Sequence, residues 1–144
     1  MLRYLTGISI CIWVFVACQS SEPAPELKQA FEVHEMALIT FDSLTSELDA
    51  LQALELAPEG QQTLAEIKEA STQWEEGLVE VPGFEHAGHD HAHDHDHSHD
   101  HGNEELKDLP PAEMLELQEA MGAEVKRLLK ETRTLAAQAT QSSL

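Results

Sequence analysis

The sequence predicts an all-α protein: a small antiparallel three-helix bundle with a disordered His- and Asp-rich loop between its second and third helices. Apolar residues recur at steps of three and four along three long segments, which is the spacing of one helix face. No segment shows the alternating β-branched pattern of a strand, and no Asn-Gly or Asp-Gly turn joins two such segments. With 144 residues, the chain is expected to form one small domain.

The first predicted helix covers residues 26–56. Its acidic and serine residues lie mostly off the apolar stripe, so the helix is amphipathic. The Ala-Pro-Glu-Gly sequence at 57–60 breaks the pattern, and a second helix is expected to follow and complete a helical hairpin over 26–82. The apolar stripe consists of Leu27, Phe31, His34, Leu38, Phe41, Leu44, Leu48 and Leu51.

The second stripe ends at Val-Pro-Gly, residues 81–83, and a loop is predicted over 83–109. The third helix with its C-terminal tail is predicted over 110–144, since prolines are tolerated in a first helical turn. Trp74 and the methionines are assigned to the core rather than to a cofactor site. The second stripe is Leu64, Ile67, Ser71, Trp74 and Leu78, and the third is Met114, Leu117, Met121, Val125, Leu128, Leu135 and Ala139.

Residues 1–17 have the features of a secretory signal. Arg3 precedes an apolar run over residues 5–16, which is shorter than a membrane-spanning helix requires. The Phe-Val-Ala-Cys sequence at 15–18 resembles the lipobox of bacterial lipoproteins, which implies that Cys18 is diacylated and becomes the N-terminus, with a linker over 18–25. We therefore expect a protein anchored by acyl chains in the bacterial cell envelope, facing the periplasm or the cell surface. The alternative is an ordinary signal peptide that is cut elsewhere.

Charge and cysteine content restrict the partners of the mature chain. Cys11 leaves with the signal, so an acylated Cys18 leaves no thiol for a disulfide or a thiolate metal site. Loss of residues 1–17 removes Arg3 and no acidic residue, which changes the formal charge from −19 to −20. Nucleic acid and anionic lipid are disfavoured because the chain offers no basic patch.

The most informative segment is a His-rich tract at residues 86–101. Seven of its histidines occupy every second position, and four aspartates stand between them. Neutral imidazole binds Zn²⁺, Ni²⁺ and Cu²⁺, and nearby carboxylates attract cations and accept ring N–H bonds. The tract is therefore predicted to bind a divalent transition metal, with zinc favoured in the cell and nickel or copper as alternatives. The predicted ligands are His86, His89, His91, His93, His95, His97, His99 and His101.

A second interpretation of the tract is an inert or pH-responsive spacer, because such a composition cannot bury enough apolar surface to fold. His34 is the only histidine outside the tract. Its first interpretation is a core histidine with a hydrogen-bonding partner. The alternative hypothesis makes it one additional, fixed metal ligand next to His86, because a hairpin that turns at Pro58 places residue 34 level with residue 82.

No catalytic motif is present, so the chain is not predicted to be an enzyme. The sequence from His34 to Leu38 begins like the zinc-protease motif H-E-x-x-H but lacks its second histidine. Glycine-rich nucleotide loops and the G-x-S-x-G elbow are also missing from the sequence.

The lipobox, the Phe-Glu-Val-His-Glu-Met sequence at 31–36, the Ser-Thr-Gln-Trp-Glu-Glu sequence at 71–76 and the charged last helix resemble one family. These are small, uncharacterised Bacteroidetes-type lipoproteins labelled viral A-type inclusion protein. The resemblance implies an envelope location and a helical form, and it implies no activity. Relative to that pattern, the His-rich tract is an insertion.

Two functions remain open from the sequence. The first is a lipid-anchored metal-binding protein that buffers, stores or delivers its metal through the tract. The second is a helical envelope adaptor whose tract is only a spacer. Val33, Met36 and Ile39 are apolar residues outside the stripe, and they leave room for a protein partner or a homodimer.

Overall fold

The computed structural model describes residues 22–84 and 104–142. Within these ranges the only regular elements are helices, so the predicted all-α class is confirmed. Three helices are long: α1 (Pro25–Gln52), α2 (Pro58–Glu76) and α4 (Pro111–Ser142). The fourth, α3 (Glu104–Lys107), is a single turn. Predictions for residues 1–21, 85–103 and 143–144 lie outside the described residues.

Each long helix begins at a proline. The first helical residue needs no N–H partner and the ring fixes a helical φ angle, so proline favours this position. A glutamate follows within the first turn of each helix, where its charge is stabilised by the helix dipole. At the other end of α2, the Gly77 N–H donates a hydrogen bond to the Gln73 carbonyl and closes the helix.

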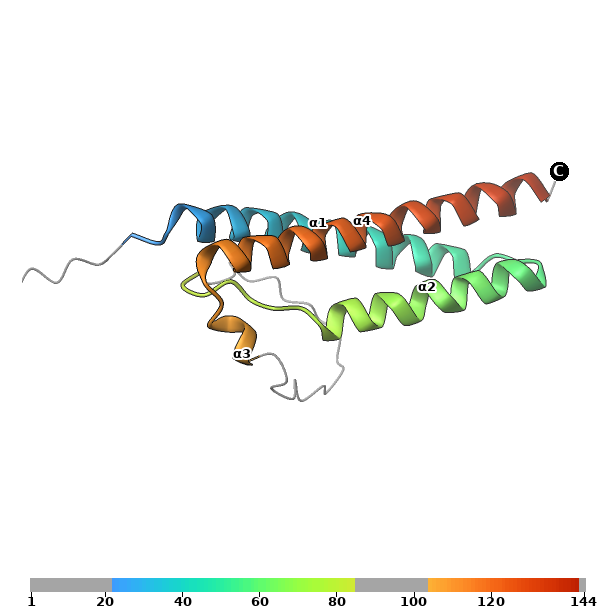
Figure 1. Ribbon diagram of the computed structural model, residues 1–144. Coiled ribbons are helices and arrows are strands. Elements are labelled where there is room, and N and C mark those ends of the chain that lie inside the picture. The colour runs from blue at the N-terminus through green and yellow to red at the C-terminus, as the bar shows by residue number, and fades with distance from the viewer. Residues whose placement is uncertain (1–21, 85–103, 143–144) are drawn as a thin grey trace, which may run out of the picture.

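The three long helices lie side by side and alternate in direction along the chain (Figure 1). Glu47 and His34 of α1 contact Arg133 and Gln118 of α4, so residue numbers rise together and the two helices are parallel. Trp74 lies beside Met121, whereas Gly60, at the start of α2, lies beside Leu135. Residue numbers therefore fall along α2 as they rise along α4, and α2 runs in the opposite direction.

The largest apolar cluster joins α1, α2 and α4. Its buried members are Ala37, Leu44, Leu48, Leu51, Leu56, Ile67, Trp74, Val125, Leu128, Leu129 and Leu135. The Trp74 ring stacks on Phe41 at a centroid distance of 4.8 Å, and its indole N–H donates to the Met121 carbonyl at 2.9 Å. Trp74 is therefore the core residue that the stripe predicted, and its side chain contacts both other long helices.

A second, smaller cluster lies at the end of the bundle where α1 and α4 begin. Ala30, Val79, Val81 and Met114 are buried in it. Two of these residues, Val79 and Val81, belong to none of the three long helices but to residues 77–84, which we call the strap. The strap leaves the end of α2 and runs back toward the starts of α1 and α4 (Figure 1).

The strap covers the part of the bundle that the shorter helix α2 does not reach. At 1.5 Å per residue, the 28 residues of α1 extend about 42 Å and the 19 residues of α2 only about 28 Å. Residues 77–84 cover the missing length, with a turn at Gly83, whose φ is 81°. Within the range predicted as a loop, 83–109, residues 104–107 form the single turn α3.

Candidate functional site

The predicted metal ligands of the tract and the predicted lipidation site, Cys18, lie outside the described residues. The segments on either side of the tract are described. Phe84 stacks on Phe31 of α1 at a centroid distance of 4.7 Å with an interplanar angle of 13°. After the tract, Leu106 and Leu109 pack on the same small cluster as Phe84. The described residues on the two sides of the tract thus lie at the same end of the bundle.

His34 lies at this same end, fully buried at 0% exposure. Its Nδ1 atom is 3.0 Å from Oε1 of Gln118 on α4. The Gln118 amide nitrogen donates to the Val79 carbonyl of the strap at 2.7 Å. One buried polar chain of contacts therefore connects α1, α4 and the strap, which agrees with the expectation that residue 34 lies level with the chain near residue 82.

The hydrogen bonds show which role Nδ1 of the His34 ring plays. Because the Gln118 amide nitrogen donates to Val79, its oxygen faces His34, and an amide oxygen can only accept. Nδ1 of His34 must then carry the proton, and in the neutral ring Nε2 carries the lone pair. Histidine ligands of metals often have this arrangement, with one nitrogen donating to an oxygen and the other facing the metal. Here Nε2 is buried from solvent, so a metal could not reach it without a rearrangement of the surrounding residues.

Gln118 was not assigned to the core from the sequence, because it is polar. It is 0% exposed, and it also lies within 3.6 Å of the Met114 sulfur. Its spacing offered a signal, since it follows Met114 by four residues and precedes Val125 by seven. A polar residue on an apolar stripe has to be paired, and His34, the one polar member of the α1 stripe, is its partner.

Among residues 22–84 and 104–142, no group of three or more His, Cys, Asp or Glu side chains is arranged to hold a metal ion. Within the same residues, no helix has the length and apolar character needed to cross a membrane.

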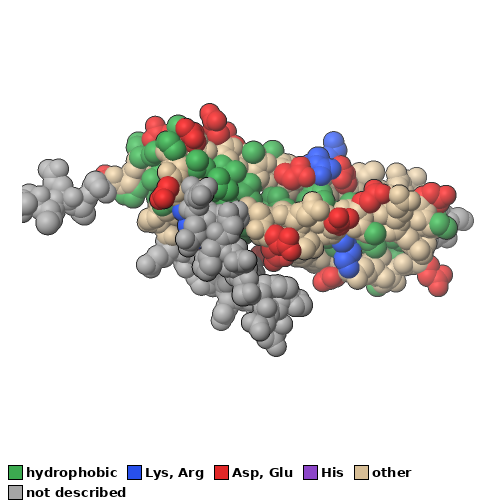
Figure 2. All heavy atoms as spheres, turned by 60° about the horizontal axis from the view of Figure 1, so that its bottom comes forward, with side chains coloured by type: hydrophobic (Ala, Val, Ile, Leu, Met, Phe, Trp, Pro, Cys, Tyr) green, Lys and Arg blue, Asp and Glu red, His purple; other side chains and the backbone are tan. Residues whose placement is uncertain are grey.

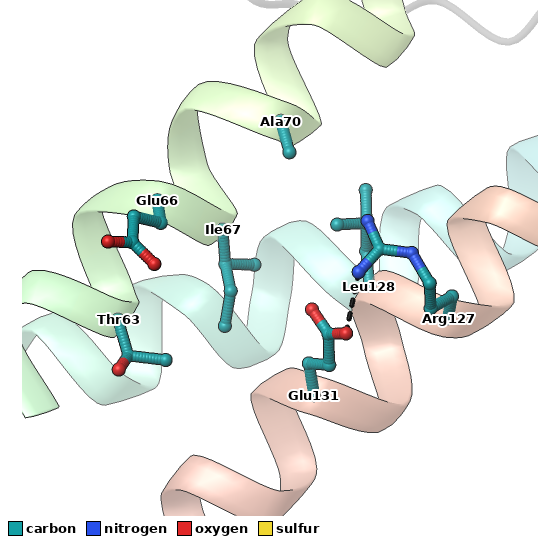
Figure 3. Close-up of a pocket in the computed structure, with 7 residues that line it drawn as sticks. All are labelled: Thr63, Glu66, Ile67, Ala70, Arg127, Leu128 and Glu131. Atoms are coloured by element: carbon teal, nitrogen blue, oxygen red, sulfur yellow. Dashed lines mark hydrogen bonds and ion pairs between the residues drawn. The ribbon is translucent and has the colours of Figure 1, made fainter.

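A shallow pocket of about 200 Å³ lies between α2 and α4 (Figure 3). Its apolar floor includes Ile67 and Leu128, and its charged rim includes Arg127. The Arg127 guanidinium donates to Glu131 at 2.6 Å and to Glu124 at 2.5 Å. Because carboxylates already occupy these donors, the pocket is not built to bind an anion.

Ion pairs on the bundle surface shift pKa values in the expected directions. The hydrogen bond from Arg127 lowers the pKa of Glu124, and the bonds from Glu124 and Glu131 raise the pKa of Arg127. Lys28 lowers the pKa of Glu22, and Glu47 raises the pKa of Arg133. All these side chains are at least one third exposed, so the pairs are screened by solvent and contribute little to stability.

Comparisons of this chain with known protein families, with curated proteins and with solved structures find no match.

Proposed function

We propose that this chain is a lipid-anchored protein of the bacterial cell envelope that binds zinc, nickel or copper through its His-rich tract. The observation that carries the proposal is the sequence of the tract, with seven histidines at every second position and four aspartates between them. Imidazole nitrogens at this density provide many alternative ligand sets for one borderline metal ion. Such sets exchange metal readily, which suits buffering, storage or delivery.

In this proposal the helices are a scaffold. The three long helices form an antiparallel bundle, and the tract is a disordered loop attached to one end of it. Two contacts support this division of roles: Phe84 packs on Phe31 just before the tract, and Leu106 packs on the same cluster just after it. The bundle can then remain folded whether the tract holds metal or not.

His34 has a structural role in this proposal. Its burial and its hydrogen bond to Gln118 support the core interpretation. The alternative, in which His34 supplies one tight metal site, requires the buried ring to become accessible. A His34→Asn variant separates the two: loss of one strong metal site with weaker sites retained would favour the ligand role, and unchanged metal binding would favour the core role.

Isothermal titration of zinc into the mature protein tests the metal-binding function. We expect the parent to bind more than one zinc ion, and a variant with all eight tract histidines changed to asparagine to bind none. A matched control changes Asp90, Asp94, Asp96 and Asp100 to asparagine, which keeps the imidazoles and should weaken binding without abolishing it. Zinc binding that survives the histidine substitutions would overturn the proposal.

An adaptor function is the second candidate, and a specific observation favours it. Met36 and Ile39 on α1 are 56% and 51% exposed, and they lie one helical turn apart. Apolar residues exposed in this way can pack against a partner protein. Changing both to glutamine should abolish capture of such a partner and leave the zinc titration unchanged.

A further inference from the structure

The end of the bundle where α1 begins carries an apolar surface. Over the small buried cluster lie seven half-buried apolar side chains, which we call the apolar end: Leu27, Phe31, Phe84, Leu106, Leu109, Leu115 and Leu117. They come from α1, the strap, the segment around α3 and the first turns of α4. Figure 2 shows hydrophobic side chains gathered at this end of the molecule, with acidic side chains around them.

We propose that the apolar end rests on the surface of a lipid bilayer and holds the bundle upright on it. This inference rests on the proposed function, because it takes the acyl chains of Cys18 as the anchor. Cys18 precedes Pro25, the first residue of α1, by seven residues. A fully extended chain of that length covers at most about 25 Å. The anchor therefore keeps the apolar end, and not the opposite end of the bundle, within reach of the bilayer.

Two occupants of the apolar end are compared, a bilayer and a second copy of the chain, and the short linker favours the bilayer. A tether of this length gives the bilayer a high effective concentration at the apolar end, and a second copy has no such advantage. Charge acts in the same direction. The exposed residues Glu26, Asp108 and Glu113 adjoin residues of the apolar end in the sequence. The two lysines of the same segments pair with glutamates, Lys28 with Glu22 and Lys107 with Glu80, so two copies that met there would bring like charges together.

The same acidic residues specify the lipid. An uncharged or zwitterionic surface accepts the half-buried leucine and phenylalanine side chains at no electrostatic cost. An anionic surface repels the glutamates and aspartate around them, and this repulsion is weakened by salt. The apolar end is therefore expected to contact phosphatidylcholine more closely than a mixture that contains phosphatidylglycerol.

Site-directed spin labelling of the acylated protein in phosphatidylcholine vesicles tests the proposal. The acylated chain has no free thiol, so a cysteine introduced at an exposed position carries the only label. Glu113→Cys places it beside the apolar end, and Thr140→Cys, the matched control, lies 27 residues further along α4, about 40 Å away. Collisions with oxygen, which concentrates in lipid, are compared with collisions with chromium oxalate, which stays in water. Nickel reagents are avoided because histidines bind them.

We expect the ratio of oxygen to chromium collisions to be several times higher at residue 113 than at residue 140. Added phosphatidylglycerol should lower the ratio at residue 113, and so should Leu117→Gln in a chain that remains helical. Equal ratios at the two positions, in protein that floats with the vesicles, would overturn the docking while leaving the anchor intact. Low collision rates with both reagents at residue 113 would identify a protein interface there and also overturn it. Protein that does not float would refute the anchor, and with it the docking.

Discussion

Replacing Gln118 with leucine should destabilise the fold far more than a surface substitution. The change keeps the size of the side chain but removes the acceptor for His34 Nδ1–H and the donor to the Val79 carbonyl. Both groups lie in a region from which water is excluded, since His34 and Gln118 are 0% exposed. Leaving a buried polar group unpaired costs about 1–3 kcal/mol, so the two together should cost about 3 kcal/mol. That is a large part of the roughly 5–15 kcal/mol by which a small domain is stable.

The assay is urea unfolding followed by circular dichroism, with the free energy of unfolding extrapolated to water. His34→Leu alone should cost less, about 1–2 kcal/mol, because Gln118 keeps its bond to Val79. The double variant should cost about 3 kcal/mol less than the sum of the two single changes, because the His34 donor and its Gln118 acceptor are removed together and neither is left unpaired. Gln29→Leu, at an exposed position on α1, is the control and should change stability by no more than about 0.5 kcal/mol. Additive costs, or a Gln118→Leu variant as stable as the parent, would refute the reasoning.

Three further predictions concern the core and the anchor. Trp74→Phe keeps an aromatic ring against Phe41 but removes the hydrogen bond to the Met121 carbonyl, so urea unfolding should show a free energy of unfolding about 1 kcal/mol lower. Trp74→Ala should lower it by about 3–5 kcal/mol. Gly122→Ala should raise the melting temperature, because a Cβ there would lie 3.4 Å from Val33 and alanine favours a helix by up to about 1 kcal/mol. Gly122→Leu should lower the melting temperature. A leucine variant that melts at a higher temperature than the alanine variant would contradict the packing of α1 on α4. Cys18→Ser should move the expressed protein from the detergent phase to the aqueous phase or leave it unprocessed, and unchanged partitioning would exclude acylation at Cys18.

Much of the fold could be predicted because helical periodicity and prolines act locally. The stripes placed Leu44, Leu48 and Trp74 in the core, and the prolines at 25, 58 and 111 stand at the helix starts. The ends of the helices were harder to predict. Leu56 was assigned to the end of the first helix, yet it is buried in the turn that follows α1.

The strap and the polar core could not be predicted, because both depend on contacts between distant segments. Val79 and Val81 follow α2 in a short stretch with no helical repeat, and only the unequal lengths of α1 and α2 require that stretch to cover the core. Gln118 is a fully buried polar residue, and its partners His34 and Val79 lie on segments that sequence spacing alone does not identify.

The central claim is that the histidines of the tract bind a metal in the intact protein, and zinc X-ray absorption spectroscopy tests it most directly. The acylated, full-length mature protein is loaded with zinc, freed of unbound metal and measured. The account predicts a first shell of nitrogen and oxygen at about 2.0–2.1 Å, outer-shell scattering from imidazole rings and no sulfur. A first shell that contains sulfur, a spectrum without imidazole scattering, or protein that retains no zinc would contradict it.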